Sequence, residues 1–129
     1  MLLHSFFKIV QTYLGEDKTV VTIQLVKEHR IYEGHFPGNP VVPGVCLVQM
    51  IREVIEVLKN QKIMLTGADE IKFLNIVNPM VVDLLKIEIK KRPKSENPLA
   101  FSVVIADGQI TYLKMRADFT AYHEKLSSI

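Results

Sequence analysis

The sequence predicts an α+β fold in which an antiparallel sheet of about six strands wraps around one central helix. The chain offers several short runs rich in β-forming residues, but only one long stretch with the spacing of a helix, residues 43–60. The polar residues of that stretch form a single stripe, and nearly everything else in it is apolar, which indicates a helix surrounded by protein. Such a helix buries its apolar surface best when antiparallel strands curve around it.

The composition fits a single domain over residues 1–129. Hydrophobic residues make up 48% of the chain and the formal net charge is +2. This length allows a real core but is short for two domains, and the small charge gives no reason to expect nucleic-acid binding. The single cysteine, Cys46, excludes an internal disulfide. Because the apolar runs are too short for a membrane helix and no secretion signal is recognisable, we expect a soluble, cytoplasmic protein.

The first half of the chain begins with two predicted strands, at residues 6–14 and 19–26. The residues between them, 15–18, include glycine and aspartate and predict a hairpin turn. In the second strand apolar residues alternate with polar ones, which is the period of a half-buried strand. Residues 27–42 follow with prolines and glycines, so we expect an ordered loop there without a helix or strand.

The second half of the chain is again rich in β-forming residues and should supply the rest of the sheet. Asp107-Gly108 lies between the last two runs and favours a type I′ hairpin turn. The chain therefore runs strand, strand, loop, helix and then strands to the end. These later strands are predicted at about residues 68–76, 84–92, 98–106 and 109–122.

The junction between the loop and the helix carries the strongest candidate for a functional site. His35 lies within a segment stiffened by prolines, and a rigid setting suits a catalytic base. Pro43 suits the first helical position, and the residue before it, Val42, has no side chain that can cap a helix. The first backbone N–H groups can therefore bind a ligand carbonyl, and Gly44 leaves room for its approach. A base beside such donors suits removal of a proton next to a thioester carbonyl.

Residues 34–45, GHFPGNPVVPGV, strongly resemble the signature of the bacterial 3-hydroxyacyl-acyl-carrier-protein dehydratases, which have the hot-dog fold. The resemblance extends through the predicted helix and to residues 71–74 and 78–79, which look like the strand and turn that follow it in that family. It implies a hot-dog fold for this chain and the conversion of 3-hydroxyacyl thioesters to trans-2-enoyl thioesters. Met80-Val81 stands where the family has Gly-Asp, which leaves the role of that loop open.

The resemblance also assigns roles to individual residues. It implies that His35 removes and returns the proton at C2, and that the N–H group of Gly44 holds the thioester carbonyl. We expect the N–H group of Val45, the next residue, to be a second carbonyl donor. The acyl chain would lie along apolar residues near a dimer interface, among them Phe36. The family carries an acid from the partner subunit fourteen positions after its histidine, and here that position is Gln49. A glutamine has no ionisable proton, and losing general-acid assistance typically slows a step by about 10²–10⁴-fold.

Two functions follow from this combination. The first is a dehydratase of fatty-acid or related lipid or polyene biosynthesis, whose partner is an acyl carrier protein bearing a 3-hydroxyacyl chain. It would need no dissociable cofactor, because the phosphopantetheine arm arrives with the substrate. The second is a catalytically impaired hot-dog subunit that binds acyl carrier protein or pairs with an active relative. We expect at least a homodimer; a trimer of dimers and a heterodimer remain open, and a thioesterase is a weaker third function.

Other residues have competing interpretations. Gln49 can face the substrate or can be the first exposed residue of the polar stripe. Cys46 lies at a helix start, where thiols are activated, but no base is predicted beside it, so a buried small hydrophobe is favoured. Glu33 is a substitute acid or, more simply, a solvated loop carboxylate. The remaining histidines form no metal-ligand pattern with Cys46 or the carboxylates, so we expect no metal site.

Overall fold

The computed structural model describes residues 1–34, 38 and 40–122. Its strands form one antiparallel sheet with the order β1-β2-β4-β5-β6-β3. The elements follow one another along the chain as β1 (Phe7–Leu14), β2 (Thr19–Leu25), α1 (Ile31–Gly34), α2 (Gly44–Lys59), β3 (Ile63–Phe73), β4 (Leu84–Lys91), β5 (Ala100–Ala106) and β6 (Thr111–Ala121).

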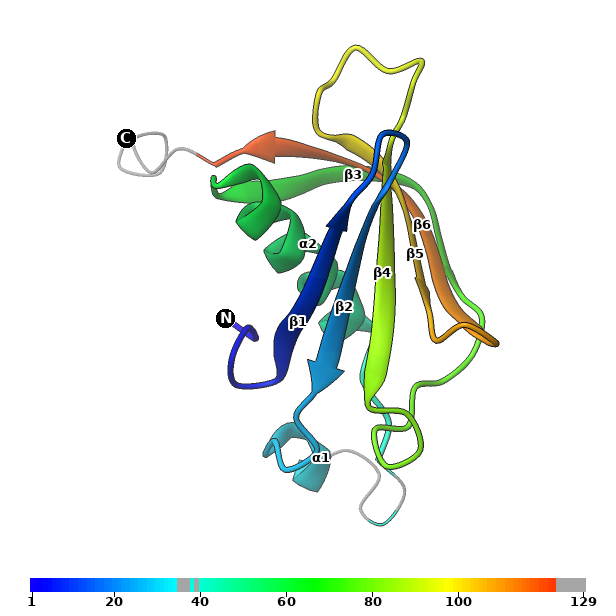
Figure 1. The fold of residues 1–129 in the computed structure, drawn as a ribbon. Coiled ribbons are helices and arrows are strands. Elements are labelled where there is room, and N and C mark those ends of the chain that lie inside the picture. Colours follow the sequence, from blue (N-terminus) through cyan, green and yellow to red (C-terminus); the bar gives the residue numbers. More distant parts are fainter. Residues whose placement is uncertain (35–37, 39, 123–129) are drawn as a thin grey trace, which may run out of the picture.

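The sheet curves around α2, which lies along its inner face (Figure 1). The inward side of α2 has no exposed surface at Met50, Ile51, Val54 or Ile55. Burying each such side chain contributes about 1.5–3 kcal/mol relative to leaving it exposed. The inner face of the sheet supplies the matching apolar side chains, among them Val21, Ile23, Leu85, Ile87, Ile105, Leu113 and Phe119. The predicted α+β arrangement, with an antiparallel sheet of six strands around one central helix, is confirmed.

The predicted helix is confirmed to within a residue at each end, but the role of its proline differs. Pro43 is the N-cap residue, with φ −59° and ψ 142°, and the first helical residue is Gly44. The last helical residue is Lys59, and the C-cap residue Asn60 has a φ of 50°, which places it in the left-handed conformation. Asparagine is one of the few residues that adopt this conformation readily, which is why it can stop the helix here.

The predicted loop over residues 27–42 contains a short helix, α1, so the expectation of no helix there is wrong. The prolines of this segment come only after α1 has ended, so they do not interfere with it. The backbone N–H of Ile31 donates to Nδ1 of His29 at 3.1 Å, which caps the start of α1. The His29 ring also packs edge-on against Phe6, with 5.1 Å between ring centroids.

Strand β3 is the element whose position was predicted least well. It begins at Ile63, not near residue 68, and ends at Phe73. Its first residues show no alternation of apolar and polar side chains, and its pairing with β6 is interrupted by irregularities after Leu65 and after Ala68. The strand is held by its neighbour β6 rather than by a pattern of its own.

The two predicted hairpins are confirmed, but the turn type of the second is not. Gly15 N donates to Lys18 O at 2.9 Å and closes the β1–β2 turn. In the β5–β6 turn Gly108 has a φ of 103°, while Asp107 has no positive φ. A type I′ turn at Asp107-Gly108 needs both, so that prediction is wrong. The Asp107 carboxylate instead accepts from the N–H groups of Gln109 and Ile110.

Candidate active site

Three of the five predicted site residues lie on α2. Gly44 and Val45 are its first two residues, and Gln49 lies about one turn further on. His35 and Phe36 fall outside the described residues, so the predicted contact between the base and the helix start is not tested. The described part of the predicted site is therefore the start of α2 and the residues around it.

The start of α2 has no side-chain cap, as the sequence predicted. Pro43 provides no side-chain cap, and its carbonyl accepts from the N–H groups of Cys46 at 3.0 Å and Leu47 at 3.2 Å. Within the described part of the chain, the N–H groups of Gly44 and Val45 have no acceptor. Val45 is 74% exposed, so the second residue of the helix faces solvent. Two adjacent N–H groups at a helix start can stabilise negative charge on a ligand oxygen.

A contact with Phe73 adds a structural reason for glycine at position 44. A Cβ atom on Gly44 would lie 2.9 Å from Cε1 of Phe73, closer than real Cβ atoms come to a carbon. Phe73 is the last residue of β3 and is 55% exposed, so its ring covers the helix start while facing solvent. Sequence reasoning missed this residue, because nothing in the local pattern indicates that the end of β3 reaches α2.

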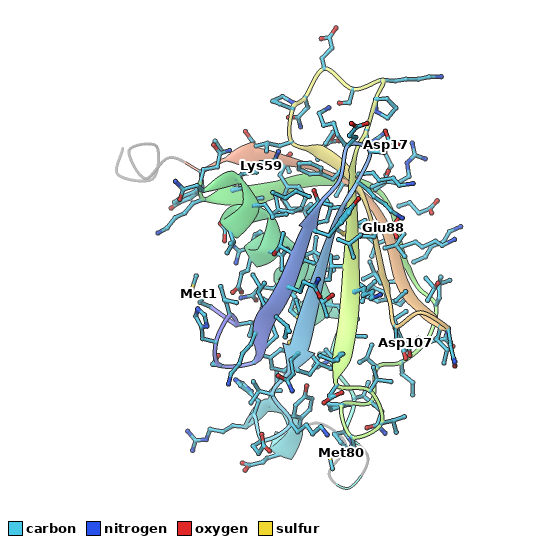
Figure 2. The ribbon with its side chains drawn as sticks, in the orientation of Figure 1. Met1, Asp17, Lys59, Met80, Glu88 and Asp107 are labelled. Carbon is cyan, nitrogen blue, oxygen red and sulfur yellow. The ribbon has the colours of Figure 1, made fainter. Side chains whose placement is uncertain are left out.

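The segment after β3 forms an apolar edge beside the same helix start. Val42 N donates to Val77 O at 2.9 Å, which ties the chain entering α2 to this segment. Ile76, Met80 and Val81 are exposed by 71%, 62% and 78%. Figure 2 shows Met80 at the same end of the molecule as α1. The Met80-Val81 pair that replaces the family's Gly-Asp is thus part of an exposed apolar surface.

Glu53 is a buried carboxylate in the polar stripe of α2. Its side chain is only 1% exposed. Its oxygens accept from the N–H of Leu2 at 2.9 Å, from the N–H of Leu3 at 2.8 Å and from Nε2 of Gln49 at 2.9 Å. Glu53 belongs to the predicted polar stripe but is buried, because the N-terminal segment folds over it. The spacing of four residues between Gln49 and Glu53 was the available signal.

The hydrogen bonds of Glu53 decide its ionisation. Burial raises the pKa of this carboxyl, but the hydrogen bonds from Leu2, Leu3 and Gln49 and the charge of the N-terminal amine outweigh burial and lower it. Glu53 is therefore a carboxylate at neutral pH and has no proton to donate. It cannot serve as the general acid that position 49 lacks.

Cys46 and Tyr32 lie in the interior behind the helix start. Burial raises the pKa of the Cys46 thiol, so the thiol stays neutral, in agreement with its interpretation as a small buried hydrophobe. Tyr32 on α1 packs against Phe6 with 5.6 Å between ring centroids. Its hydroxyl is buried and has no hydrogen-bond partner among the described residues. Burial and the nearby Cys46 both raise the pKa of this phenol, which stays protonated. No sequence pattern indicated that this hydroxyl is buried.

The described residues gather no group of three or more histidine, cysteine, aspartate or glutamate side chains that could hold a metal ion. The described helices also include none that is long and apolar enough to cross a membrane. Glu33, which the sequence offered as a candidate substitute for the missing acid at position 49, is an exposed residue of α1.

Comparison with known proteins identifies the family. The family model described as ApeI dehydratase matches residues 11–114, which is most of the chain. The chain belongs to the ApeI-like dehydratase family. The resemblance seen at residues 34–45 is thereby confirmed at the level of a dehydratase family.

Curated relatives of this ApeI-like chain include FabZ 3-hydroxyacyl-acyl-carrier-protein dehydratases. The protein of Lactococcus lactis subsp. lactis is 33% identical over 85 residues, which cover 60% of this chain and 56% of that protein. The protein of Zymomonas mobilis subsp. mobilis is 32% identical over 95 residues, which cover 66% of this chain and 60% of that protein. The chain thus spans less than two thirds of the length of these relatives.

Solved structures establish the fold of the ApeI-like chain as the hot-dog fold. The dehydratase heterocomplex ApeI:P from Xenorhabdus doucetiae superposes with a TM-score of 0.70 at 16% identity, over 86% of this chain and 95% of that one. The E. coli PaaI protein from the phenylacetic acid degradation operon gives 0.61 at 15% identity, over 91% of this chain and 80% of that one. At these identities the likeness concerns the fold alone.

Proposed function

We propose that this chain takes part in the dehydration of 3-hydroxyacyl thioesters, carried on acyl carrier protein, to trans-2-enoyl thioesters. The observation that carries the proposal is the uncapped start of α2, where the N–H groups of Gly44 and Val45 have no acceptor among the described residues. They follow directly on the segment that resembles the dehydratase signature. Membership of the ApeI-like family supports the same reaction class.

In the proposed reaction His35 takes a proton from C2 of the acyl chain. The C–H electron pair forms the C2–C3 double bond as the C3–O bond breaks, and the departing oxygen takes up a proton and leaves as water. Negative charge develops on the thioester oxygen on the way, and the N–H groups of Gly44 and Val45 stabilise it there. The acyl chain lies along apolar residues that include Phe36. No dissociable cofactor enters, since phosphopantetheine is part of the substrate.

Neither Gln49 nor Glu53 can supply the proton that the departing oxygen needs. Gln49 has no ionisable proton, and Glu53 beside it is held as a carboxylate. Without general-acid assistance we expect the chain alone to turn over about 10²–10⁴-fold more slowly than a complete site. The catalytically impaired subunit is therefore the second candidate function, and the Gln49–Glu53 pair is the observation that favours it.

We propose that the working enzyme is an assembly, with a dimer as its smallest form. Strand β3 lies at the edge of the sheet and carries the exposed side chains of Met64 and Leu65, which offers a surface for a second subunit. A related subunit with an acid at the equivalent of position 49 would complete the site, while this chain contributes His35 and the helix start. ApeI:P from Xenorhabdus doucetiae, whose structure has a similar fold, is a dehydratase heterocomplex. We expect the assembly in the cytoplasm, where Cys46 stays reduced.

The test is to incubate the purified chain with a 3-hydroxyacyl-pantetheine thioester and follow the absorbance of the enoyl product. We expect slow turnover by the wild type, faster turnover by Gln49→Glu, and none by His35→Ala. Turnover that survives His35→Ala would overturn the site assignment. If the wild type is inactive and Gln49→Glu is active, the chain is a subunit that needs an acid from a partner.

A further inference from the structure

The connection between β3 and β4 and the turn between β5 and β6 form one exposed apolar surface. Leu74 N donates to Tyr112 O at 2.8 Å, which joins the end of β3 to the start of β6. Figure 2 shows Met80 and Asp107, one from each segment, at the same end of the molecule. The large apolar side chains gathered there are 43% to 78% exposed, and we call them the end patch: Phe73, Leu74, Ile76, Met80, Val81, Leu84 and Ile110.

The end patch differs from scattered surface apolar residues because it is continuous and uncharged. Residues 73–82 contain no charged side chain. The backbone N–H groups of Val81 and Val82 both donate to Asn78 O, at 3.0 and 2.9 Å, and this turn leaves Met80 and Val81 exposed. A soluble domain rarely exposes a continuous apolar patch unless the patch binds a protein or a membrane.

The residue types of the end patch favour a bilayer over a protein partner. The energetic centres of protein interfaces are enriched in Trp, Tyr and Arg, whereas Leu and Val are under-represented there. All residues of the end patch are aliphatic or methionine except Phe73, whose ring covers Gly44. The edge proposed for a second subunit lies elsewhere, at Met64 and Leu65 near the other end of β3.

Three exposed lysines of the outer sheet face lie next to the end patch. Lys86 is two residues from Leu84 on β4, so both side chains are on the same face. Lys114 of β6 is paired directly opposite Lys72 of β3, which reaches Glu70 at 3.6 Å. Within the described part of the chain, Lys86 and Lys114 form no ion pair. Like charges in opposite positions destabilise a sheet, and a nearby anion would remove this repulsion.

The acidic groups at this end of the molecule are held within the fold or lie to one side. The Asp107 carboxylate accepts from two backbone N–H groups of its own turn, and Asp83 is half-buried. Glu33 is exposed but belongs to α1, which packs toward the β1 side through Tyr32 and Phe6. The exposed charge beside the end patch is therefore mainly that of the lysines.

We propose that the end patch is a membrane-docking surface, whose apolar side chains enter the headgroup region of an anionic bilayer while Lys72, Lys86 and Lys114 contact lipid phosphates. Apolar side chains flanked by lysines are the combination that binds such surfaces. The start of α2 then lies close to the bilayer, because Val42 before the helix is bonded to Val77 within the same segment. The inference is independent of the proposed reaction, since docking requires no thioester.

Co-sedimentation of the full chain with lipid vesicles tests this proposal. Vesicles of phosphatidylethanolamine and phosphatidylglycerol are the anionic probe, and vesicles of phosphatidylcholine are the neutral one. We expect the wild type to bind the anionic vesicles more tightly. Lys86→Gln with Lys114→Gln should weaken that binding by about 5–30-fold. Ile76→Ser with Val81→Ser should weaken it by about 10-fold or more, and both side chains are exposed, so folding should be retained.

Matched controls change the same kinds of exposed residue elsewhere on the chain. Val10→Ser with Leu14→Ser removes two exposed apolar side chains from β1. Lys8→Gln with Lys94→Gln removes the same charge as the lysine variant. Both controls should bind the anionic vesicles as the wild type does.

Three results would overturn the proposal. The first is a wild type that binds neither kind of vesicle, and the second is a loss of binding that is as large in the controls as in the end-patch variants. The third comes from analytical ultracentrifugation of the lipid-free chain. If Ile76→Ser with Val81→Ser lowers the mass of the assembly, the end patch is a contact between subunits and not a membrane surface.

Discussion

Two parts of α2 carry polar groups close to the core, and the two parts differ in whether those groups have partners. At the helix start, the N–H groups of Gly44 and Val45 find no acceptor among the described residues. Two turns further on, Glu53 accepts hydrogen bonds from Leu2, Leu3 and Gln49. An unpaired donor in an open position is available to a ligand, whereas a fully bonded carboxylate supports the structure. The start of α2 is therefore a candidate binding site, whereas Glu53 is a structural residue, here termed the anchor, that attaches the N-terminal segment to the helix.

We expect the largest effect from exchanging the side chains of Gln49 and Glu53. The double variant Gln49→Glu with Glu53→Gln keeps the hydrogen bond between the positions, with donor and acceptor reversed, and moves the carboxyl group to the predicted acid position. We expect turnover of a 3-hydroxyacyl-pantetheine thioester to rise by about 10²–10⁴-fold, measured as enoyl absorbance. His35→Ala added to the exchanged chain is the control and should abolish the gain.

The single variant Gln49→Glu places a second carboxyl beside Glu53. Because two neighbouring carboxylates repel, one of them keeps its proton at neutral pH, which raises the pKa of the new acid. Turnover should then persist at pH 7 and fall as the pH rises and the shared proton is lost. A rate that stays constant across the alkaline range would show that no proton is held between the two positions.

Removing one donor at the helix start should cost less than the exchange gains. Gly44→Pro deletes the N–H of residue 44, and proline is well tolerated at a first helical position. Gly44→Ala adds a Cβ near Phe73 but keeps the N–H, so it is the matched control. We expect kcat of the exchanged chain to fall by about 10²–10³-fold in Gly44→Pro relative to Gly44→Ala. Equal rates would mean that this N–H does not contact the thioester oxygen.

The anchor at Glu53 should affect stability rather than rate, and in a pH-dependent way. Its pKa is lowered in the folded chain, so its contribution is present above the unfolded pKa and is lost as the pH falls through the folded value. At pH 7, Glu53→Gln should reduce the free energy of unfolding by about 1.5–3 kcal/mol, measured in urea. The difference between the variants should shrink on acidification. A difference that grows at low pH would contradict the ionised state of Glu53.

The smallest expected effect concerns Tyr32, whose buried hydroxyl has no partner among the described residues. An unpaired buried hydroxyl is costly, so Tyr32→Phe should leave stability unchanged or raise it by about 1 kcal/mol in thermal unfolding. Tyr112→Phe is the control, because the Tyr112 hydroxyl donates to Asp107 at 2.7 Å. It should lose about 0.5–1.5 kcal/mol. A comparable loss in Tyr32→Phe would show that its hydroxyl has a partner in the undescribed part of the chain.

The features that depend on neighbouring residues were predicted well from the sequence. The helix around Gly44–Lys59, the turn at residues 15–18 and the uncapped helix start follow from local spacing, from proline and from the lack of a capping side chain. The segment at residues 34–45 also identified the family correctly. These properties are fixed by a few consecutive residues, so no knowledge of the distant chain was needed.

The features that the sequence did not reveal depend on residues far apart in the chain. Glu53 is buried because Leu2 and Leu3, some fifty positions earlier, bond to it, and Gly44 meets a ring carried by Phe73 at the end of another element. The start of β3 is set by its pairing with β6 and not by its own pattern. The sequence by itself thus determined the long helix, its uncapped start and the strands other than β3, since these follow from local backbone chemistry. Only the tertiary structure decided that Glu53 is an anchored carboxylate, because burial is a property of how distant segments pack.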